Sequence, residues 1–191
     1  VPADVASLIG PQGALTELAT TLMGRPAHAA RVLYFDKTEA VNWTLPWHQD
    51  RTIAVAQRVD LPGYEVWTMK AGVPHVEPPE PILRGMVAIR LHLDDCGMNN
   101  APLQVVSASF RRGRLTEREM KNLPGAIRPY PCPAGDVVAM RGLSVHASQR
   151  DGAAPTSRHP RRLRDGGPAR RAVLGHASTV SRRRPQTKLL R

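Results

Sequence analysis

The chain has 191 residues, 41% of them hydrophobic, which is enough for one domain with its own apolar core. No apolar run approaches the ~18 residues that would indicate a membrane span. No leader peptide is visible at Val1, so we expect a cytoplasmic protein without membrane partners. Cys96 and Cys132 are the only cysteines, and in a chain of this size we expect free buried thiols.

The formal net charge of +11 is concentrated at one end of the chain. Residues 149–191 hold 12 of the 27 Lys and Arg but only two acids, which gives this segment +10 and leaves +1 for the first 148 residues. A nucleic-acid partner could therefore be bound only by the tail. Because the body carries no nucleic-acid-binding motif, we rank that function last.

The N-terminal part predicts a helix followed by a strand. Leu15, Leu18, Leu22 and Met23 recur at helical spacing within residues 1–29, and Gly24 is a plausible helix end. The next segment, Arg31-Val32-Leu33-Tyr34-Phe35, is rich in residues that favour strands.

The stretch Trp47-His48-Gln49-Asp50 carries the first candidate metal ligands. If it is extended, His48 and Asp50 point to the same face, because side chains alternate along a strand. A second histidine, His146, could complete a set of two His and one carboxylate, which is the facial triad of non-haem Fe(II) oxygenases. The spacing alone more often marks a surface turn with a solvated histidine.

The segments after Asp50 predict a strand over residues 52–59 and a proline-rich loop. Four prolines within residues 74–81 predict an extended segment without regular structure. His75 in this segment could touch a substrate, or it could fix the loop by bonding backbone.

Residues 86–94 give the clearest strand in the chain. Val87, Ile89, Leu91 and Leu93 share one face, and Ala88, Arg90, His92 and Asp94 share the other. This pattern suits a small barrel or jelly roll whose polar face lines a lumen, although an exposed sheet face would give the same pattern.

The C-terminal half of the body predicts a capped helix and the segment that carries His146. Thr116 and Glu119 have the spacing of a capping box. Ser148 has the same parity as His146, so its hydroxyl can face the same space.

Nine blocks of residues resemble the phytanoyl-CoA dioxygenase family, and its bacterial members most of all, in order and spacing over about residues 30–148. They are Leu33-Tyr34-Phe35-Asp36-Lys37-Thr38, Asn42-Trp43, Trp47-His48-Gln49-Asp50, Lys70-Ala71-Gly72-Val73-Pro74-His75-Val76, Arg90-Leu91-His92-Leu93-Asp94-Asp95-Cys96, Ala101-Pro102-Leu103, Arg112-Gly113-Arg114-Leu115, Gly135-Asp136 and His146-Ala147-Ser148. The resemblance implies a mainly β, double-stranded β-helix (jelly-roll or cupin-like) with flanking helices, and an Fe(II)- and 2-oxoglutarate-dependent dioxygenase that uses O2 to hydroxylate a small organic molecule.

The resemblance also implies the roles of individual residues. It makes His48, Asp50 and His146 the iron ligands and Ser148 a residue that binds 2-oxoglutarate. Gln49, beside the ligand pair, is assigned to co-substrate binding as well. The family also carries a 2-oxoglutarate-binding arginine shortly after the distal histidine, and Arg158 is the nearest candidate, with Arg161 and Arg162 as alternatives.

The chain departs from the family in two places. Relatives read Pro-Gly-Ser-His where this chain has Ser107-Ala108-Ser109-Phe110, so the turn loses its glycine. After Ser148 the residues no longer follow the family pattern, and an arginine-rich sequence without hydrophobic periodicity replaces the expected closing strand. We therefore divide the chain into an oxygenase-like domain, residues 1–148, and a basic tail, residues 149–191, which is disordered, divergent or out of frame.

Two further functions compete with the dioxygenase. A barrel without a closing strand or a co-substrate arginine could be an inactive member of the fold that binds a ligand or a partner protein. The tail could bind a polyanion, with steeply salt-dependent affinity. The sequence carries no signal for the substrate or for the oligomeric state.

Overall fold

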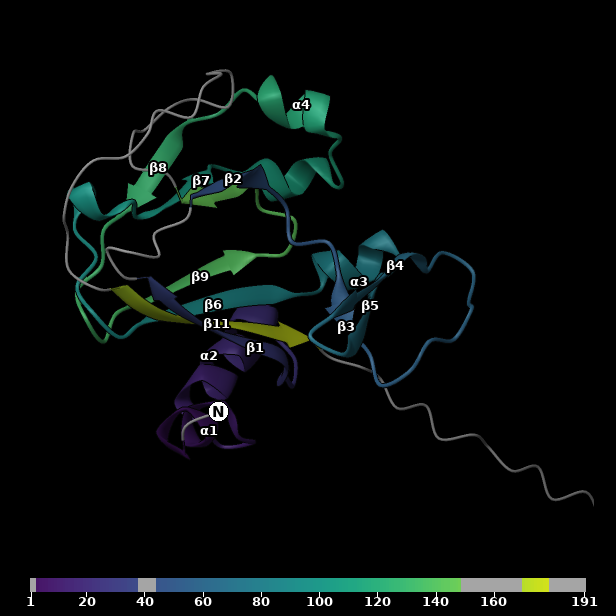
Figure 1. The fold of residues 1–191 in the computed structure, drawn as a ribbon, viewed down its shortest axis with the longest axis horizontal. Helices are drawn as coiled ribbons and strands as arrows, with labels where there is room; N and C mark the ends of the chain where they lie inside the picture. Colours follow the sequence, from purple (N-terminus) through teal and green to yellow (C-terminus); the bar gives the residue numbers. More distant parts are fainter. Residues whose placement is uncertain (1–2, 38–43, 149–169, 179–191) are drawn as a thin grey trace, which may run out of the picture.

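The structure, a computed structural model, describes residues 3–37, 44–148 and 170–178. Two four-stranded antiparallel sheets face each other (Figure 1). The first sheet has the order β1-β11-β6-β9, with β1 at His28–Lys37, β11 at Arg170–Ser178, β6 at Val87–His92 and β9 at Val137–Arg141. The second sheet has the order β2-β10-β7-β8, with β2 at Leu45–His48, β10 at His146–Ser148, β7 at Leu103–Val106 and β8 at Ile127–Tyr130.

The chain passes back and forth between the two sheets. It goes from β1 in the first sheet to β2 in the second, returns to β6, crosses to β7 and β8, returns to β9 and crosses again to β10. This alternation closes two antiparallel sheets into one sandwich, which is the jelly-roll form of the double-stranded β-helix. The predicted mainly β fold class is confirmed.

One helix packs on the outer face of the first sheet, and a second helix packs against the first (Figure 1). The helix on the sheet is α2 at Ala14–Met23, and the one packed against it is α1 at Ala3–Ile9. Leu15 and Leu18 of α2 pack with Val87 and Ile89 of β6, as the predicted apolar faces require. The helix ends at Gly24, whose φ of 66° is the left-handed conformation that glycine adopts without steric cost. Among the residues described, no helix is long and apolar enough to cross a membrane.

The proline-rich segment is more regular than expected. Val73–Glu77 forms β5, the central strand of a third sheet of order β3-β5-β4, and Glu80–Arg84 forms α3. The outer strands of this sheet are β3 at Ile53–Ala54 and β4 at Glu65–Lys70. The prediction of an irregular loop was wrong because Pro79 and Pro81 lie at the cap and in the first turn of α3. Backbone N–H groups at these positions have no acceptor within the helix, so proline, which has no N–H, removes no helical hydrogen bond there.

Beyond Ser148 the structure differs from the expected absence of a closing strand. β11 lies between β1 and β6, pairing with both in antiparallel register (yellow in Figure 1). Its apolar run, Ala172-Val173-Leu174, is short and follows two arginines, so hydrophobic periodicity gives little signal there. Residues 149–169 and 179–191, which include Arg158, Arg161 and Arg162, lie outside the described residues.

Short helical elements lie in the connections between β6 and β7 and between β7 and β8. They are η1 at Met98–Asn100, η2 at Ser109–Arg112 and α4 at Glu117–Lys121. The predicted capping box of α4 is confirmed, because Thr116 and Glu119 exchange hydrogen bonds between side chain and backbone. In the turn that lost its glycine, Ala108 has a φ of 57°, a conformation that costs about 1–2 kcal/mol for a residue with a Cβ.

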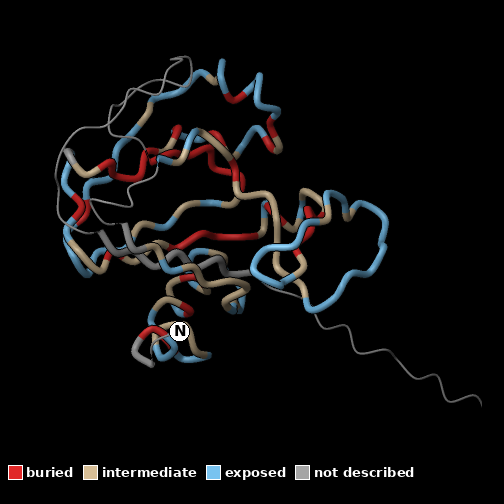
Figure 2. Tube along the Cα trace, viewed as in Figure 1, coloured by how far each residue is buried: buried red, intermediate tan, exposed pale blue. Residues whose placement is uncertain are grey.

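Burial is highest in the strands that build the space between the two sheets. Figure 2 shows buried positions concentrated along the middle of the sandwich, and β6, β7 and β10 contain mostly buried residues. The third sheet is different, since every residue of β4 except Trp67 is exposed. The functional residues must therefore be sought between the two large sheets.

Gly142 provides a test of this packing. It lies between β9 and the segment leading to His146, and a Cβ there would collide with the carbonyl oxygen of Leu83. We expect Gly142→Ala to lower the free energy of unfolding by about 1–3 kcal/mol, as overpacking does elsewhere. Gly97→Ala is the matched control, because a Cβ there would meet no atom within 4 Å and the φ of −74° suits alanine. Equal thermal unfolding midpoints for the two variants would contradict this account.

Candidate metal centre

Two neighbouring strands of the second sheet bring the predicted iron ligands together. His48 ends β2, Asp50 follows two residues later, and His146 begins β10. β2 and β10 pair in antiparallel register with His48 directly opposite His146. The two imidazole rings consequently lie with centroids 4.2 Å apart.

The three side chains offer their ligand atoms to one small volume. One atom from each of His48, Asp50 and His146 lies within 4.8 Å of the other two. The Asp50 carboxylate lies 4.0 Å from Nε2 of His48 and 3.6 Å from Nε2 of His146. Two imidazole nitrogens and one carboxylate on one side of a point form the donor set of non-haem Fe(II) sites, which leaves other coordination positions for ligands.

Backbone carbonyls fix which nitrogen of each ring can bind a metal. Nδ1 of His48 lies 2.7 Å from the carbonyl oxygen of Pro46, and Nδ1 of His146 lies 3.0 Å from that of Ser144. A carbonyl oxygen only accepts hydrogen bonds, so each Nδ1 must carry the proton and each Nε2 keeps its lone pair. Both Nε2 atoms face Asp50, and metal-binding histidines commonly have their other ring nitrogen fixed by a hydrogen bond in this way.

A cavity of about 190 Å³ opens from this site into the space between the sheets. Asp50 and the two histidines border it from the second sheet. Its other described lining residues are Leu33, Phe35, Leu45, Arg90, Leu103, Met140 and Ser148. Arg90 is the one arginine or lysine among these lining residues, and most of the others are apolar.

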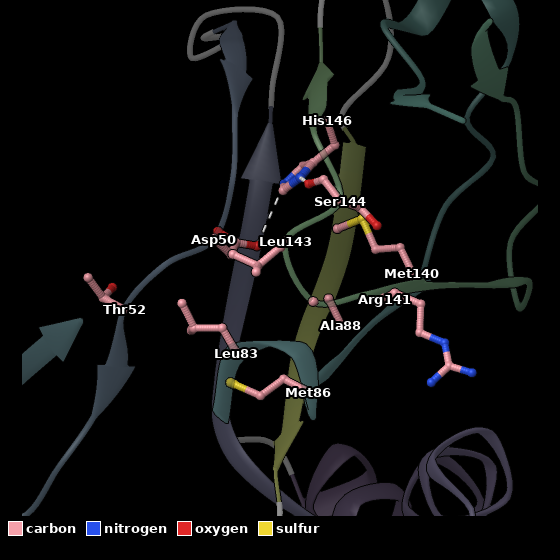
Figure 3. A pocket seen from close by; sticks show the side chains of 11 residues that line it. Asp50, Thr52, Leu83, Met86, Ala88, Met140, Arg141, Leu143, Ser144 and His146 are labelled. Carbon is pink, nitrogen blue, oxygen red and sulfur yellow. Dashed lines mark hydrogen bonds and ion pairs between the residues drawn. The ribbon is translucent and has the colours of Figure 1, made fainter. Parts of the chain in front are cut away.

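A second, smaller cavity of about 20 Å³ is also bordered by Asp50 and His146. Figure 3 shows these two residues joined by their ion pair, with Leu143 beside Asp50 and with Leu83 and Met86 below. This cavity is too narrow for an organic ligand, so access to the candidate metal centre is from the larger cavity.

The structure does not bring Gln49 to the cavity. Its side chain is buried on the opposite side of the strand, where Nε2 donates to the carbonyl oxygens of Gly113 and Leu143 and Oε1 accepts from the N–H of Leu115. The amide thereby ties the ligand-bearing segment to the loop after η2 and to the turn before His146. Both ends of the candidate site are held by this one side chain.

A buried carboxylate holds the chain immediately after Asp50. Arg51 makes a two-pronged ion pair with Glu77, with contacts of 2.8–3.1 Å, and Arg114 approaches the same carboxylate at 3.1 Å. Glu77 is buried at the end of β5. Sequence reasoning missed this cluster, because only the fold brings two arginines to one glutamate.

Of the remaining candidate residues that the structure describes, only Ser148 borders a cavity at the site. Ser148 lines the larger cavity, and its hydroxyl donates to the carbonyl oxygen of Ala101 over 3.0 Å. His75 is buried with Nδ1 2.9 Å from the carbonyl oxygen of Val73, and it does not border either cavity. Arg158 lies outside the described residues.

His92, predicted to share a face with Arg90, is buried rather than cavity-lining. Burial lowers the pKa of His92 to about 4, and the nearby charge of Arg90 acts in the same direction. The imidazole is therefore neutral in the folded protein at neutral pH.

Gln49 gives a first prediction for this region. Gln49→Leu leaves two carbonyl oxygens and one N–H buried without their partner, so we expect the free energy of unfolding to fall by about 3–5 kcal/mol. Gln57→Leu, at an exposed position, is the matched control and should stay within ~0.5 kcal/mol of wild type. Chemical denaturation measures both, and a mild effect at Gln49 would show that the amide does not hold the site.

His92 predicts how stability depends on pH. The unfolded chain protonates this histidine near pH 6.5, whereas the folded chain does so only near 4. Acidification between these values therefore favours unfolding, by up to about 3 kcal/mol in total. In metal-free protein, His92→Gln should flatten the fall of the unfolding midpoint between pH 6.5 and 4, and His28→Gln, at an exposed position, should not. Parallel profiles for wild type and His92→Gln would refute the assignment.

One known protein family matches most of the chain. Residues 3–162 match the family model described as phytanoyl-CoA dioxygenase (PhyH). No curated protein matches the chain.

Several solved structures share the fold. EvdMO1 is 19% identical with a TM-score of 0.61, over 94% of this chain and 33% of that one. EctD from S. alaskensis, solved with 2-oxoglutarate and 5-hydroxyectoine, is 17% identical with a TM-score of 0.63, over 94% of this chain and 54% of that one. SnoK from nogalamycin biosynthesis, described as a non-heme alpha ketoglutarate dependent carbocyclase, is 16% identical with a TM-score of 0.56, over 93% of this chain and 58% of that one. The chain thus spans between about a third and three fifths of the length of these proteins.

Proposed function

The chain belongs to the phytanoyl-CoA dioxygenase family, and from that premise we propose that it is an Fe(II)- and 2-oxoglutarate-dependent dioxygenase that hydroxylates a small organic substrate. The observation that carries the proposal is the cluster of His48, Asp50 and His146, with both Nδ1 atoms bonded to backbone carbonyls. A surface turn with a solvated histidine would not need this tautomer at two positions. The donor set fits Fe(II), because it combines two neutral imidazoles with one carboxylate.

The protein's own contribution to such a reaction is to bind, orient and exclude water. His48, Asp50 and His146 would hold the iron on the second sheet, and the carbonyl groups of Pro46 and Ser144 keep the two imidazoles aimed at it. Bound together with 2-oxoglutarate, the iron would supply the activation of O2, in which the co-substrate leaves as succinate and CO2 and one oxygen atom enters a substrate C–H bond.

The larger cavity would hold the organic reactants. Its leucine, phenylalanine and methionine side chains suit the carbon skeleton of a small molecule and limit the access of water. We place this activity in the cytoplasm, because Cys96 and Cys132 are not joined in a disulfide and a reducing compartment keeps both thiols and iron reduced.

The alternative of an inactive binding protein rested on a missing closing strand and a missing co-substrate arginine. β11 occupies a central place in the first sheet, which removes the first of these reasons. The second reason depends on which basic residue binds the carboxylate of the co-substrate. Arg158, the residue proposed from the family pattern, is one candidate for this role.

The test of the proposed function measures succinate and iron together. Wild-type protein should form succinate only when Fe(II), 2-oxoglutarate and O2 are all present. Asp50→Ala should abolish this and weaken iron binding by more than ~100-fold, or about 3 kcal/mol, because it removes the anionic ligand of the set. The Asp50 side chain is 35% exposed, so the unfolding midpoint of the metal-free variant should hardly change.

The matched control is Asp60→Ala, which removes an exposed carboxylate that pairs with Arg58. It should keep wild-type iron affinity and succinate formation. Iron bound by Asp50→Ala as tightly as by wild type would refute the candidate metal centre, and iron bound without any 2-oxoglutarate turnover would favour the inactive alternative.

A further inference from the structure

Arg90 lies across the larger cavity from the candidate metal centre. It sits in β6, a central strand of the first sheet, paired with Val138 of β9 on one side and with Leu174 of β11 on the other. Its side chain borders the same cavity as His48, Asp50, His146 and Ser148, which all belong to the second sheet or its continuation. A ligand held by the metal and extending into the cavity would therefore meet Arg90 at its far end.

The guanidinium of Arg90 has no anion to pair with in the described part of the chain. No hydrogen bond or ion pair joins it to those residues, and its buried Nε lacks a partner among them. Burial lowers the pKa of Arg90, which is the mark of a cation taken out of water without compensation. The groups whose negative charge would favour the charged form of Arg90 are the thiols of Cys96 and Cys132. Burial raises the pKa of Cys132, so this thiol is neutral at neutral pH.

A cation that is largely removed from water without a counter-charge destabilises the fold, and an anionic ligand in the cavity would supply that charge. The cavity wall offers no second candidate of that kind among the described residues. Asp50 is the carboxylate of the metal centre, and the Ser148 hydroxyl donates its proton to Ala101. With that hydrogen bond in place, Ser148 has no proton left to donate to a carboxylate, whereas Arg90 has a full set of N–H donors.

We propose that Arg90 binds the carboxylate of 2-oxoglutarate that lies remote from the iron. The proposal rests on the proposed function, because it takes the 2-oxo acid end of the co-substrate to be the end held by the metal. The dicarboxylate then spans the cavity from the second sheet to the first, and the guanidinium binds the remote carboxylate with charge-assisted hydrogen bonds.

This assignment differs from the one that the family pattern gives. The pattern places the co-substrate arginine shortly after the distal histidine, at Arg158. Arg90 instead projects from the middle of a sheet, where strand pairing on both sides fixes its backbone. Co-substrate binding would then need no side chain from residues 149–169, the segment that contains Arg158, Arg161 and Arg162.

The experiment compares two oxo acids on anaerobic Fe(II) protein, read by the visible charge-transfer band of the bound oxo acid. 2-Oxopentanoate carries a methyl group where 2-oxoglutarate carries its remote carboxylate. Arg90→Met should raise the Kd of 2-oxoglutarate by about 10- to 100-fold, and leave the Kd of 2-oxopentanoate within ~2-fold of the wild-type value. Arg90→Lys should fall between, because an ammonium keeps the charge but not the paired N–H geometry.

Two further variants make the result specific. Arg128→Met removes an exposed arginine from β8 and should change neither Kd. Metal-free Arg90→Met should unfold at the same temperature as wild type or a higher one, because methionine replaces an uncompensated cation with an apolar side chain of similar length.

Several results would overturn the proposal. They are an unchanged Kd of 2-oxoglutarate in Arg90→Met, an equal loss for both oxo acids, or a loss in Arg158→Ala that Arg90→Met does not show. In each of these cases the proposed function would stand, because wild-type protein would still bind 2-oxoglutarate. A wild-type protein that binds iron but gives no band with 2-oxoglutarate would overturn both.

Discussion

The pairing of β2 with β10 is the constraint on which the candidate site depends. Antiparallel register sets His48 opposite His146, and the segment after β2 brings Asp50 to the same site. A shift of one residue in this register would place the two histidines on opposite faces of the sheet, because side chains alternate along a strand. The metal centre is in this sense a property of one strand pair, and the surrounding structure keeps that pair in register.

Buried polar groups supply that support. Gln49 joins three backbone groups on either side of the site, and Ser109 accepts from the N–H of Val145 while donating to the carbonyl oxygen of Val106. The Glu77 cluster fixes the chain just after Asp50. Each group satisfies backbone atoms or charges that would otherwise be buried without partners, so positional precision at the metal centre and stability have the same origin.

The sandwich divides the chemistry between its two sheets. The second sheet carries the three candidate metal ligands, and the first sheet carries Arg90 on the far wall of the cavity. The other face of the first sheet is buried under α2, so β6 has one face for packing and one for the cavity. The alternation of Val87 and Ile89 with Ala88 and Arg90 expresses this double role within four residues.

The sequence by itself determined the local features of this protein: the apolar face of α2, the capping box at Thr116, the two faces of β6 and, through the family resemblance, the identity of the three candidate ligands. Each of these depends on spacing within one segment or on a short block of residues. Tertiary structure alone decided that Gln49 faces away from the cavity, that the proline-rich segment forms a strand at Val73–Glu77 and a helix at Glu80–Arg84, that residues 170–178 complete the first sheet, and that Arg90 lacks a partner among the described residues. Those outcomes depend on pairing and burial between segments far apart in the chain, and no periodicity within one segment records which distant backbone or charge will lie beside it.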